Sequence, residues 1–302
     1  MTLSLETGGA MWAMRAESIT AKQREYAGQQ LVAVPDAGRR PPGAPAPRLP
    51  VSPGTRIIPI SGVLLKDWTP EVEQAGDTSL TELARSIRAA HAAPDVRAVV
   101  LYVDSVGGAM PGVAEAAQAV AHLSAVKPVY AFSDGNLLGA AYWIASAARK
   151  VYISGPMVNV GGIDIVATHT EVSRPGVKHT LISAGDWRGM PAQGHELTGK
   201  GFKALQDRVH YMHSLFVTDV AKHRKLDRAA LLAGAGDGRV YIGQQAIKTG
   251  LVDAIVGPLE TFLGRLAAQT AGAPPSPQST TAPTGQARAS GASTHTMFRK
   301  TP

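Results

Sequence analysis

Two neighbouring glycines, Gly107 and Gly108, stand where backbone amides could stabilise a negative charge. They lie in the stretch LYVDSVGGAMPGV, in which an apolar strand is expected to end at Asp104 and a helix to begin near Pro111. Ligand sites of α/β folds gather at the carboxyl ends of strands, and a residue without a Cβ lets its N–H approach an anion closely. The pair is therefore a candidate oxyanion hole. On spacing alone, a tight strand-to-helix turn explains the two glycines at least as well.

A second candidate is the segment FSDGNLLGAAYWIASAARKVYIS, residues 132–154. A predicted strand runs into Gly139 and then into a helix of very small residues, an arrangement in which some enzymes hold a nucleophile. The turn Leu138-Gly139-Ala140-Ala141 carries no nucleophile at all. The alanines also have a purely structural use, because they let a helix pack tightly under neighbouring strands.

Other side chains could do chemistry, but each has an ordinary explanation. Asp164 and Asp186 could share a proton or bind a cation if they lay together, although two solvated loop carboxylates are the simpler interpretation. His210 and His213 have a metal-ligand spacing that an exposed helix face explains better, so no metal site is predicted. Four serines and two lysines are interpreted as capping, packing or surface residues: Ser105, Ser133, Ser146, Ser183, Lys150 and Lys178.

The composition is that of a globular protein. The 302 residues are 44% hydrophobic and 18% charged and include no cysteine, which excludes disulfides, thiolate metal sites and a cysteine nucleophile. The formal net charge is +7, but no run of Lys and Arg suggests a nucleic-acid groove. No signal peptide and no apolar run of membrane-spanning length is recognised, so a soluble protein without a membrane anchor is expected.

Strands that alternate with helices predict an α/β fold with parallel strands. The central domain is expected over residues 55–268. Residues 1–54 are interpreted as an N-terminal helix, AMRAESITAKQREYA, followed by a Pro/Gly-rich linker. Residues 269–302 lack the apolar side chains for a core and are expected to be a disordered tail rich in Ala, Pro, Ser and Thr.

Five segments in order resemble the signal-peptide-peptidase-A-type serine peptidases of the ClpP/crotonase superfamily, and within them the capsid-maturation proteases of tailed phages. They are MWAMRAESI, GDTSLTELARSIRAAHAAPDVRAVVLYVDSVGG, AAYWIASAARKVYIS, VGGIDIVATHTEVSRPGVKHTLISAG and GRVYIGQQAIKTGLVDAIVG. The resemblance covers roughly residues 55–258. It implies a repeated ββα spiral with a mainly parallel sheet, and an oxyanion hole at Gly107 and Gly108. Val106 stands where the family usually has proline.

The resemblance also implies where a serine–lysine dyad belongs, and both positions are substituted. The position of the nucleophilic serine is Gly139, and that of the general-base lysine is Asp186. The family's Gly-Ser-Ile-Gly run reads Gly161-Gly162-Ile163-Asp164 here. Glycine has no side chain that could attack a carbonyl carbon. The sequence therefore predicts a pseudoenzyme without Ser–Lys peptidase activity and without a cofactor.

The resemblance further implies partners and a setting. We expect an extended polypeptide or a capsid or scaffold protein as partner, self-association into a homo-oligomer, no membrane and no specific nucleic acid. A phage-encoded or prophage-encoded protein would act in the host cytoplasm or the procapsid. Two alternatives stay open: an active peptidase that uses another serine, and an acyl-CoA enzyme of the crotonase branch, for which Glu115 is the only candidate acid.

Overall fold

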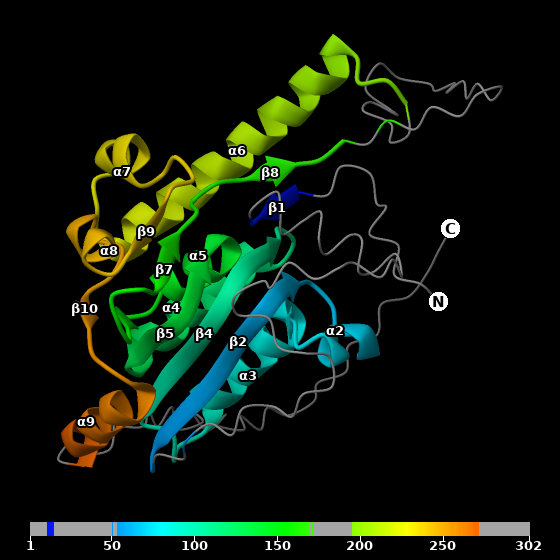
Figure 1. Ribbon diagram of the computed structural model, residues 1–302. Coiled ribbons are helices and arrows are strands. Elements are labelled where there is room, and N and C mark those ends of the chain that lie inside the picture. The colour runs from blue at the N-terminus through cyan, green and yellow to red at the C-terminus, as the bar shows by residue number, and fades with distance from the viewer. Residues whose placement is uncertain (1–10, 15–49, 51–52, 170, 172–194, 272–302) are drawn as a thin grey trace, which may run out of the picture.

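The apolar run of residues 98–103 lies in the central strand of a mainly parallel sheet, which has ten strands among the residues that the structure describes (Figure 1). This strand, β4 (Ala98–Ala109), pairs in parallel with β2 (Thr55–Leu65) on one side and β5 (Val129–Leu138) on the other. The computed structural model describes residues 11–14, 50, 53–169, 171 and 195–271. Because both faces of β4 are covered, nearly every residue of the run is apolar and buried.

The shorter strands extend this sheet at both sides. They are β1 (Met11–Ala13), β3 (Thr78–Ser79), β6 (Lys150–Ile153), β7 (Asn159–Gly161), β8 (Val166–Ala167), β9 (Val240–Ile242) and β10 (Ala254–Ile255). β6 and β10 continue the parallel order beyond β5, whereas β1 pairs antiparallel with both β4 and β8, and β9 pairs antiparallel with β7. The predicted N-terminal helix is wrong at its first two residues, since Ala13 belongs to β1 and Met14 lies in a bend, and its remainder from residue 15 on lies outside the described residues.

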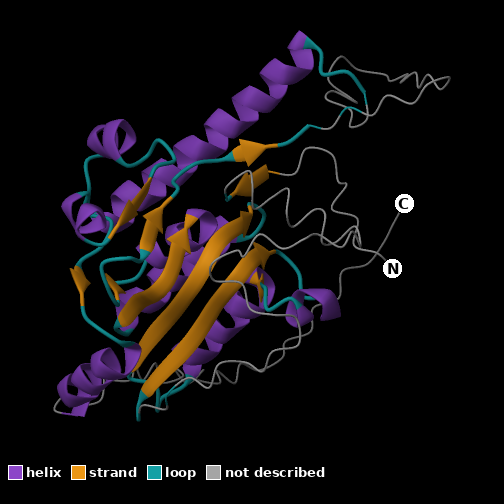
Figure 2. Cartoon of the chain, viewed as in Figure 1, coloured by secondary structure: helices purple, strands orange, loops and turns teal. Residues whose placement is uncertain are grey.

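Helices cover the two faces of the sheet unequally (Figure 2). Alternate residues of β4 point to opposite faces: Leu101 packs with the cluster that includes α3, α4 and α5, whereas Val100 packs with Phe262 and its neighbours on α9. The helices are α2 (Pro70–Gln74), α3 (Leu80–Ala92), α4 (Val113–Val126), α5 (Gly139–Ser146), α6 (Gly199–Arg224), α7 (Arg228–Gly234), α8 (Gln244–Lys248) and α9 (Leu259–Ala271).

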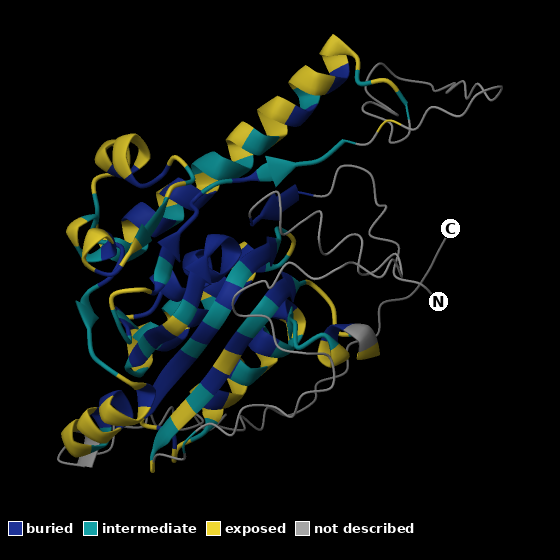
Figure 3. Ribbon diagram, in the orientation of Figure 1, coloured by how far each residue is buried: buried dark blue, intermediate teal, exposed yellow. Residues whose placement is uncertain are grey.

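Two amphipathic helices show how helical periodicity leads to burial. On α3, the apolar residues at helical spacing are all buried, namely Leu80, Leu83, Ile87 and Ala90, and Ser79 caps that helix by accepting a hydrogen bond from the Glu82 N–H at 3.3 Å. On α6, the apolar stripe is buried at Leu205, Phe216 and Val220, while Phe202 is 54% exposed. The N-terminal turns of α6 extend beyond the sheet (Figure 3), so the sheet does not cover Phe202.

The predicted α/β fold with a mainly parallel sheet is confirmed. The domain boundaries at residues 54 and 268 stay predictions, and the predicted tail lies outside the described residues except for its first turn, which belongs to α9. Within the part of the chain that the structure describes, no helix combines the length and the apolar character needed to span a bilayer.

Candidate active site

The glycine pair lies inside β4 rather than in a turn, which corrects the predicted boundaries. β4 continues through Asp104 to Ala109, and α4 begins only at Val113, after its N-cap Gly112. The strand extends this far because its second half has partners on both sides, β2 on one and β1 on the other. The glycines therefore serve close strand packing, and neither the turn nor the helix start that we expected lies directly behind them.

Each glycine of the pair permits one close backbone contact. A Cβ at Gly108 would overlap the carbonyl oxygen of Leu64 and lie 2.5 Å from the Leu64 nitrogen. A Cβ at Gly107, whose φ is +100°, would overlap the carbonyl oxygen of Ala13. The Gly107 N–H donates to Ser105 Oγ at 3.2 Å, so this amide is already engaged. Gly108, which is the Cα partner of Ala13, is thus the better candidate donor of the pair.

Gly139 is the first residue of α5, directly after the end of β5, as the sequence predicts. Its φ of +54° lies in the left-handed region that favours glycine. A Cβ built on Gly139 would overlap the carbonyl oxygen of Ala13 and lie 2.8 Å from the Ala13 carbonyl carbon. The space that a side chain at position 139 would need is therefore filled by the backbone of β1.

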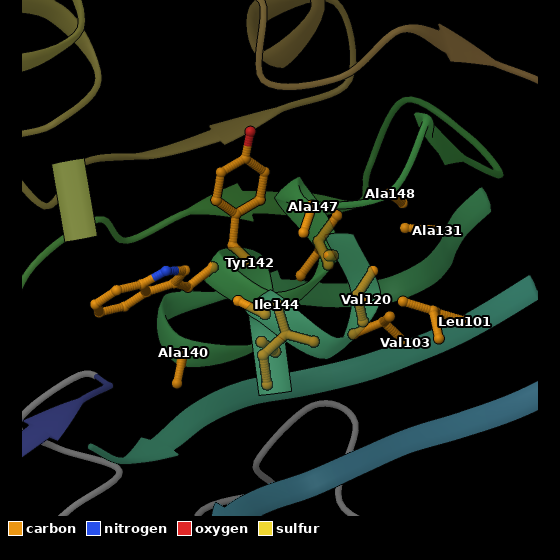
Figure 4. Packing of buried hydrophobic residues seen from close by; sticks show 14 of the residues in the cluster. Leu101, Val103, Val120, Ala131, Ala140, Tyr142, Ile144, Ala147 and Ala148 are labelled. Carbon is orange, nitrogen blue, oxygen red and sulfur yellow. The ribbon is translucent and has the colours of Figure 1, made fainter. Parts of the chain in front are cut away.

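The α5 helix is buried over its whole length, which explains its small residues. Its side chains pack against those of β4 and α4, and Figure 4 shows Ile144 of α5 near Val103 and Val120. The larger Tyr142 points towards the closing segment (Figure 4), where its hydroxyl donates to the carbonyl of Leu251 at 2.9 Å, and Trp143 stacks on Phe216 of α6. The helix is a rigid support for position 139.

A chain of polar side chains, which the sequence analysis did not identify, joins β4, β5 and β7. The carboxylate of Asp104 on β4 accepts from the Asn136 N–H at 2.9 Å, and Asn159 Nδ2 on β7 donates to Asn136 Oδ1 at 3.0 Å. Burial raises the pKa of Asp104, although hydrogen bonds from Asn136 oppose the increase. Because these groups hold Asn136 near the end of β5, they help to position the start of α5. The motif DS before the glycine pair is the only sequence signal that points to this role.

The loop that follows β7 also lies beside Gly139. A Cβ on Gly162 would lie 3.5 Å from the Gly139 nitrogen, so this part of the predicted site is brought together. The side chain of Asp164 instead faces Gly238, where a Cβ would lie 3.0 Å from Asp164 Oδ2. Asp186 lies outside the described residues, so its predicted place opposite Gly139 and near Asp164 stays a prediction.

The serines considered as replacement nucleophiles are buried wherever the structure describes them. Ser133 and Ser146 are fully buried and Ser105 nearly so, while Ser183 lies outside the described residues. Ser146 Oγ lies 3.3 Å from His223 Nδ1, but its hydroxyl donates to the Trp143 carbonyl at 2.6 Å. A serine that is fully buried and donates its proton to a carbonyl is structural.

The candidate bases and metal ligands have structural roles as well. Lys150 donates to Asp253 Oδ1 at 2.9 Å, and this hydrogen bond raises the pKa of Lys150, whereas a neutral lysine base needs a lowered pKa. His213 does not lie on a free helix face, because its Nε2 is 2.8 Å from the Gly236 carbonyl oxygen. His210 is exposed, and no group of three metal-ligating side chains occurs among the described residues. Glu115 is exposed on the first turn of α4.

Comparisons with known proteins agree with this architecture. Residues 121–270 match Peptidase family S49. The chain is 26% identical over 213 residues to "Capsid assembly protease C" of Escherichia phage lambda, covering 69% of this chain and 48% of that protein. It is 26% identical over 215 residues to a head-tail preconnector protein of Enterobacteria phage P21, covering 67% and 41%. The chain thus spans about half or less of the length of these two relatives.

Solved structures resemble the chain more remotely. A mutant of the 1510-N membrane-bound stomatin-specific protease aligns with a TM-score of 0.44 and 12% identity, covering 71% of this chain and 85% of that one.

Proposed function

We propose that the chain, whose residues 121–270 match Peptidase family S49, is a capsid-assembly-type member of that family that binds an extended polypeptide without cleaving it by a serine–lysine dyad. Its relation to peptidases rests on the family match and on the phage relatives. The loss of catalysis, the capsid partner and self-association into a homo-oligomer are the proposed refinements.

The observation that carries the proposal is the environment of Gly139. The resemblance puts the family's serine at this position, where the chain has no side chain, and the direction of a Cβ is blocked by the Ala13 carbonyl. The φ of +54° and the nearby backbone carbonyl both favour glycine at position 139. The position therefore differs from that of a catalytic serine in its backbone as well as in its missing hydroxyl group. This argues against a nucleophile at position 139 as long as β1 stays in place.

The rest of the site supports binding more than catalysis. Every described serine that was considered as a replacement is buried, and the described lysine among the candidate bases is held in its charged form by a carboxylate. The edge of β4 at Gly108 does pair with an extended strand, and strand addition of this kind is a common mode of peptide recognition. Since the sequence relatives include two phage proteins of head assembly, a capsid or scaffold polypeptide is the proposed partner.

A fluorophosphonate probe and an unfolded protein substrate test the proposal together. The unmodified chain is expected to give neither labelling nor cleavage. Labelling of the folded chain that disappears after heat denaturation would show a fold-dependent nucleophile and would refute the proposal. The matched variant is Gly139→Ser/Asp186→Lys. Because a Cβ at position 139 meets β1, the same double change is also made with Trp12→Ala, which loosens β1. Activity gained only by these variants supports the assigned dyad positions.

A further inference from the structure

The strand β1 lies between the edges of β4 and β8 in the manner of a bound peptide, and these two edges are called the peptide cleft below. It is only three residues long and lies between β4 and β8, antiparallel to both. Residues 14–54 separate it from β2, so no tight hairpin dictates its position. An extended peptide that adds to exposed strand edges makes the same kind of contact. The chain therefore carries within itself a segment that behaves as a ligand of this sheet.

The register of β1 places one peptide group at the candidate catalytic position. The Met110 N–H donates to the Met11 carbonyl at 3.0 Å, which marks this pair as hydrogen-bonded. Since such pairs alternate along an antiparallel ladder, Ala13 and Gly108 form the next one. The Ala13 carbonyl thus faces the amide of Gly108, the candidate oxyanion donor.

The same carbonyl is enclosed from two further sides. Cβ atoms built on Gly107 and on Gly139 would both overlap its oxygen, and they would lie 3.2 Å and 2.8 Å from its carbon. A hydroxyl group attached to a Cβ at position 139 would therefore meet the carbonyl carbon of Ala13. In the geometry of a peptidase, the bond between Ala13 and Met14 stands where a scissile bond would stand.

The side chains of the segment define what the cleft accepts. Trp12 and Met14 are each 1% exposed and share a small apolar cluster with Val63, while Ala13 is fully buried against the main core. The cleft thus accepts bulky apolar side chains on both sides of one small residue. Among the described residues, Trp12 Nε1 has no hydrogen-bond partner. A buried donor without a partner is destabilising, so β1 is a displaceable occupant.

We propose that the segment Met11–Met14 is an internal pseudosubstrate that closes the peptide cleft, and that an extended polypeptide with a bulky–small–bulky apolar pattern must displace it in order to bind. This inference rests on the proposed function, because it names the ligand pattern and the regulation of the same cleft. The occupant belongs to the same chain, so its effective concentration at the cleft is high. This lowers the apparent affinity of every external peptide that competes with it.

Peptide binding by the full-length chain tests the displacement. The probe is a fluorescein-labelled synthetic peptide with the sequence of residues 9–16, GAMWAMRA, followed by fluorescence anisotropy. The variant Ala13→Asp puts a carboxylate at a fully buried position and expels the strand, so it should bind the probe at least about tenfold more tightly than the unmodified chain. The exposed change Ala89→Asp on α3 is the control and should bind as the unmodified chain does. A peptide with Phe in place of Trp, which has no N–H to bury, should bind more tightly than GAMWAMRA.

A disulfide test locates the strand independently of any effect on folding. The chain has no cysteine, and Trp12 and Ala109 form a non-hydrogen-bonded pair, in which Cα atoms lie about 4.5 Å apart, close enough for a disulfide. Trp12→Cys/Ala109→Cys should oxidise to an intramolecular disulfide, seen as a mass loss and a gel shift, and should then lose peptide binding until it is reduced. Trp12→Cys/Ala89→Cys is the control and should not cross-link within the chain.

The outcomes separate this inference from the function on which it rests. The internal pseudosubstrate would be overturned if the unmodified chain and Ala13→Asp bound the peptide equally well and the Trp12→Cys/Ala109→Cys variant formed no internal disulfide. Peptide binding itself would then still stand. A disulfide between two chains would show that β1 is exchanged between copies of the protein. The occupant would then not be internal, and the inference as stated would be overturned. A correct internal disulfide with no peptide binding by any variant would refute the proposed function, although β1 lies as described.

Discussion

Replacing Gly139 by alanine adds one methyl group to the centre of the candidate site, and the structure predicts its effect. The residue has a φ of +54°, so any other L-amino acid there costs about 1–2 kcal/mol in backbone strain. The new Cβ would also overlap the Ala13 carbonyl oxygen. Because that atom belongs to the backbone, no side-chain rotation relieves the overlap, and β1 must move.

The cost of moving β1 is limited by the entropy that it recovers. Undocking exposes the buried side chains of Met11, Trp12 and Met14, each worth about 2 kcal/mol of burial. It also frees the four residues of the segment, which regain about 1–2 kcal/mol of backbone entropy each. These terms nearly cancel, so Gly139→Ala should lower the free energy of unfolding by about 1–3 kcal/mol, mostly through strain.

Urea denaturation measures this difference, with a helical glycine as control. Gly264 on α9 has no atom within 4 Å of a built Cβ and no positive φ, so Gly264→Ala should raise the free energy of unfolding by about 0.5–1 kcal/mol. In Gly139→Ala, Trp12 should in addition become accessible to acrylamide quenching, by comparison with the same change in a Trp12→Phe background. Unchanged stability together with a protected Trp12 would show that the Ala13 carbonyl does not lie beside Gly139.

Three further changes test the surroundings of the site. Burial alone would raise the pKa of Asp253, but hydrogen bonds, first among them that from Arg224, hold it below its usual range. Asp253→Asn should therefore cost about 3 kcal/mol in urea melts at pH 7, a difference that disappears as the pH falls below about 4. Burial lowers the pKa of His223, so protonation opposes folding, and the unmodified chain should lose thermal stability as the pH falls below about 6.5, a loss that His223→Gln abolishes. Gly108→Ala should lower the free energy of unfolding most, by at least about 3 kcal/mol, because its Cβ would overlap the Leu64 backbone, and a lowered thermal midpoint would show this loss.

Much of the candidate site could be predicted from the sequence, because local patterns carry it. The apolar run of β4, the glycine pair and the small residues after Gly139 are all contiguous in the chain, and the structure places them in one sheet with one helix behind it. The boundaries were predicted less well. β4 was expected to end at Asp104, since glycines usually end strands, but pairing with β1 and β2 continues it to Ala109.

The parts that could not be predicted depend on partners far away in the chain. A serine–histidine contact such as Ser146–His223, and a buried carboxylate such as Asp104 with its amide partners, arise only when distant elements meet. His213 has a metal-ligand spacing in the sequence, but the carbonyl groups of two loops decide its role. Phe202 belongs to a perfect apolar stripe, and its exposure depends on where the sheet ends.

The sequence by itself determined that position 139 has no nucleophile and that no thiol chemistry is possible, because both follow from residue identity alone. It also determined the alternation of strands and helices, since periodicity is a local property. Only the tertiary structure decided why glycine stands at position 139. Met11–Met14 had no recognisable strand signal, and its last two residues belonged to a segment interpreted as helical; only the edges of β4 and β8 give it a partner. Strand pairing is a non-local interaction, so the carbonyl that fills the cleft is visible only in the folded chain.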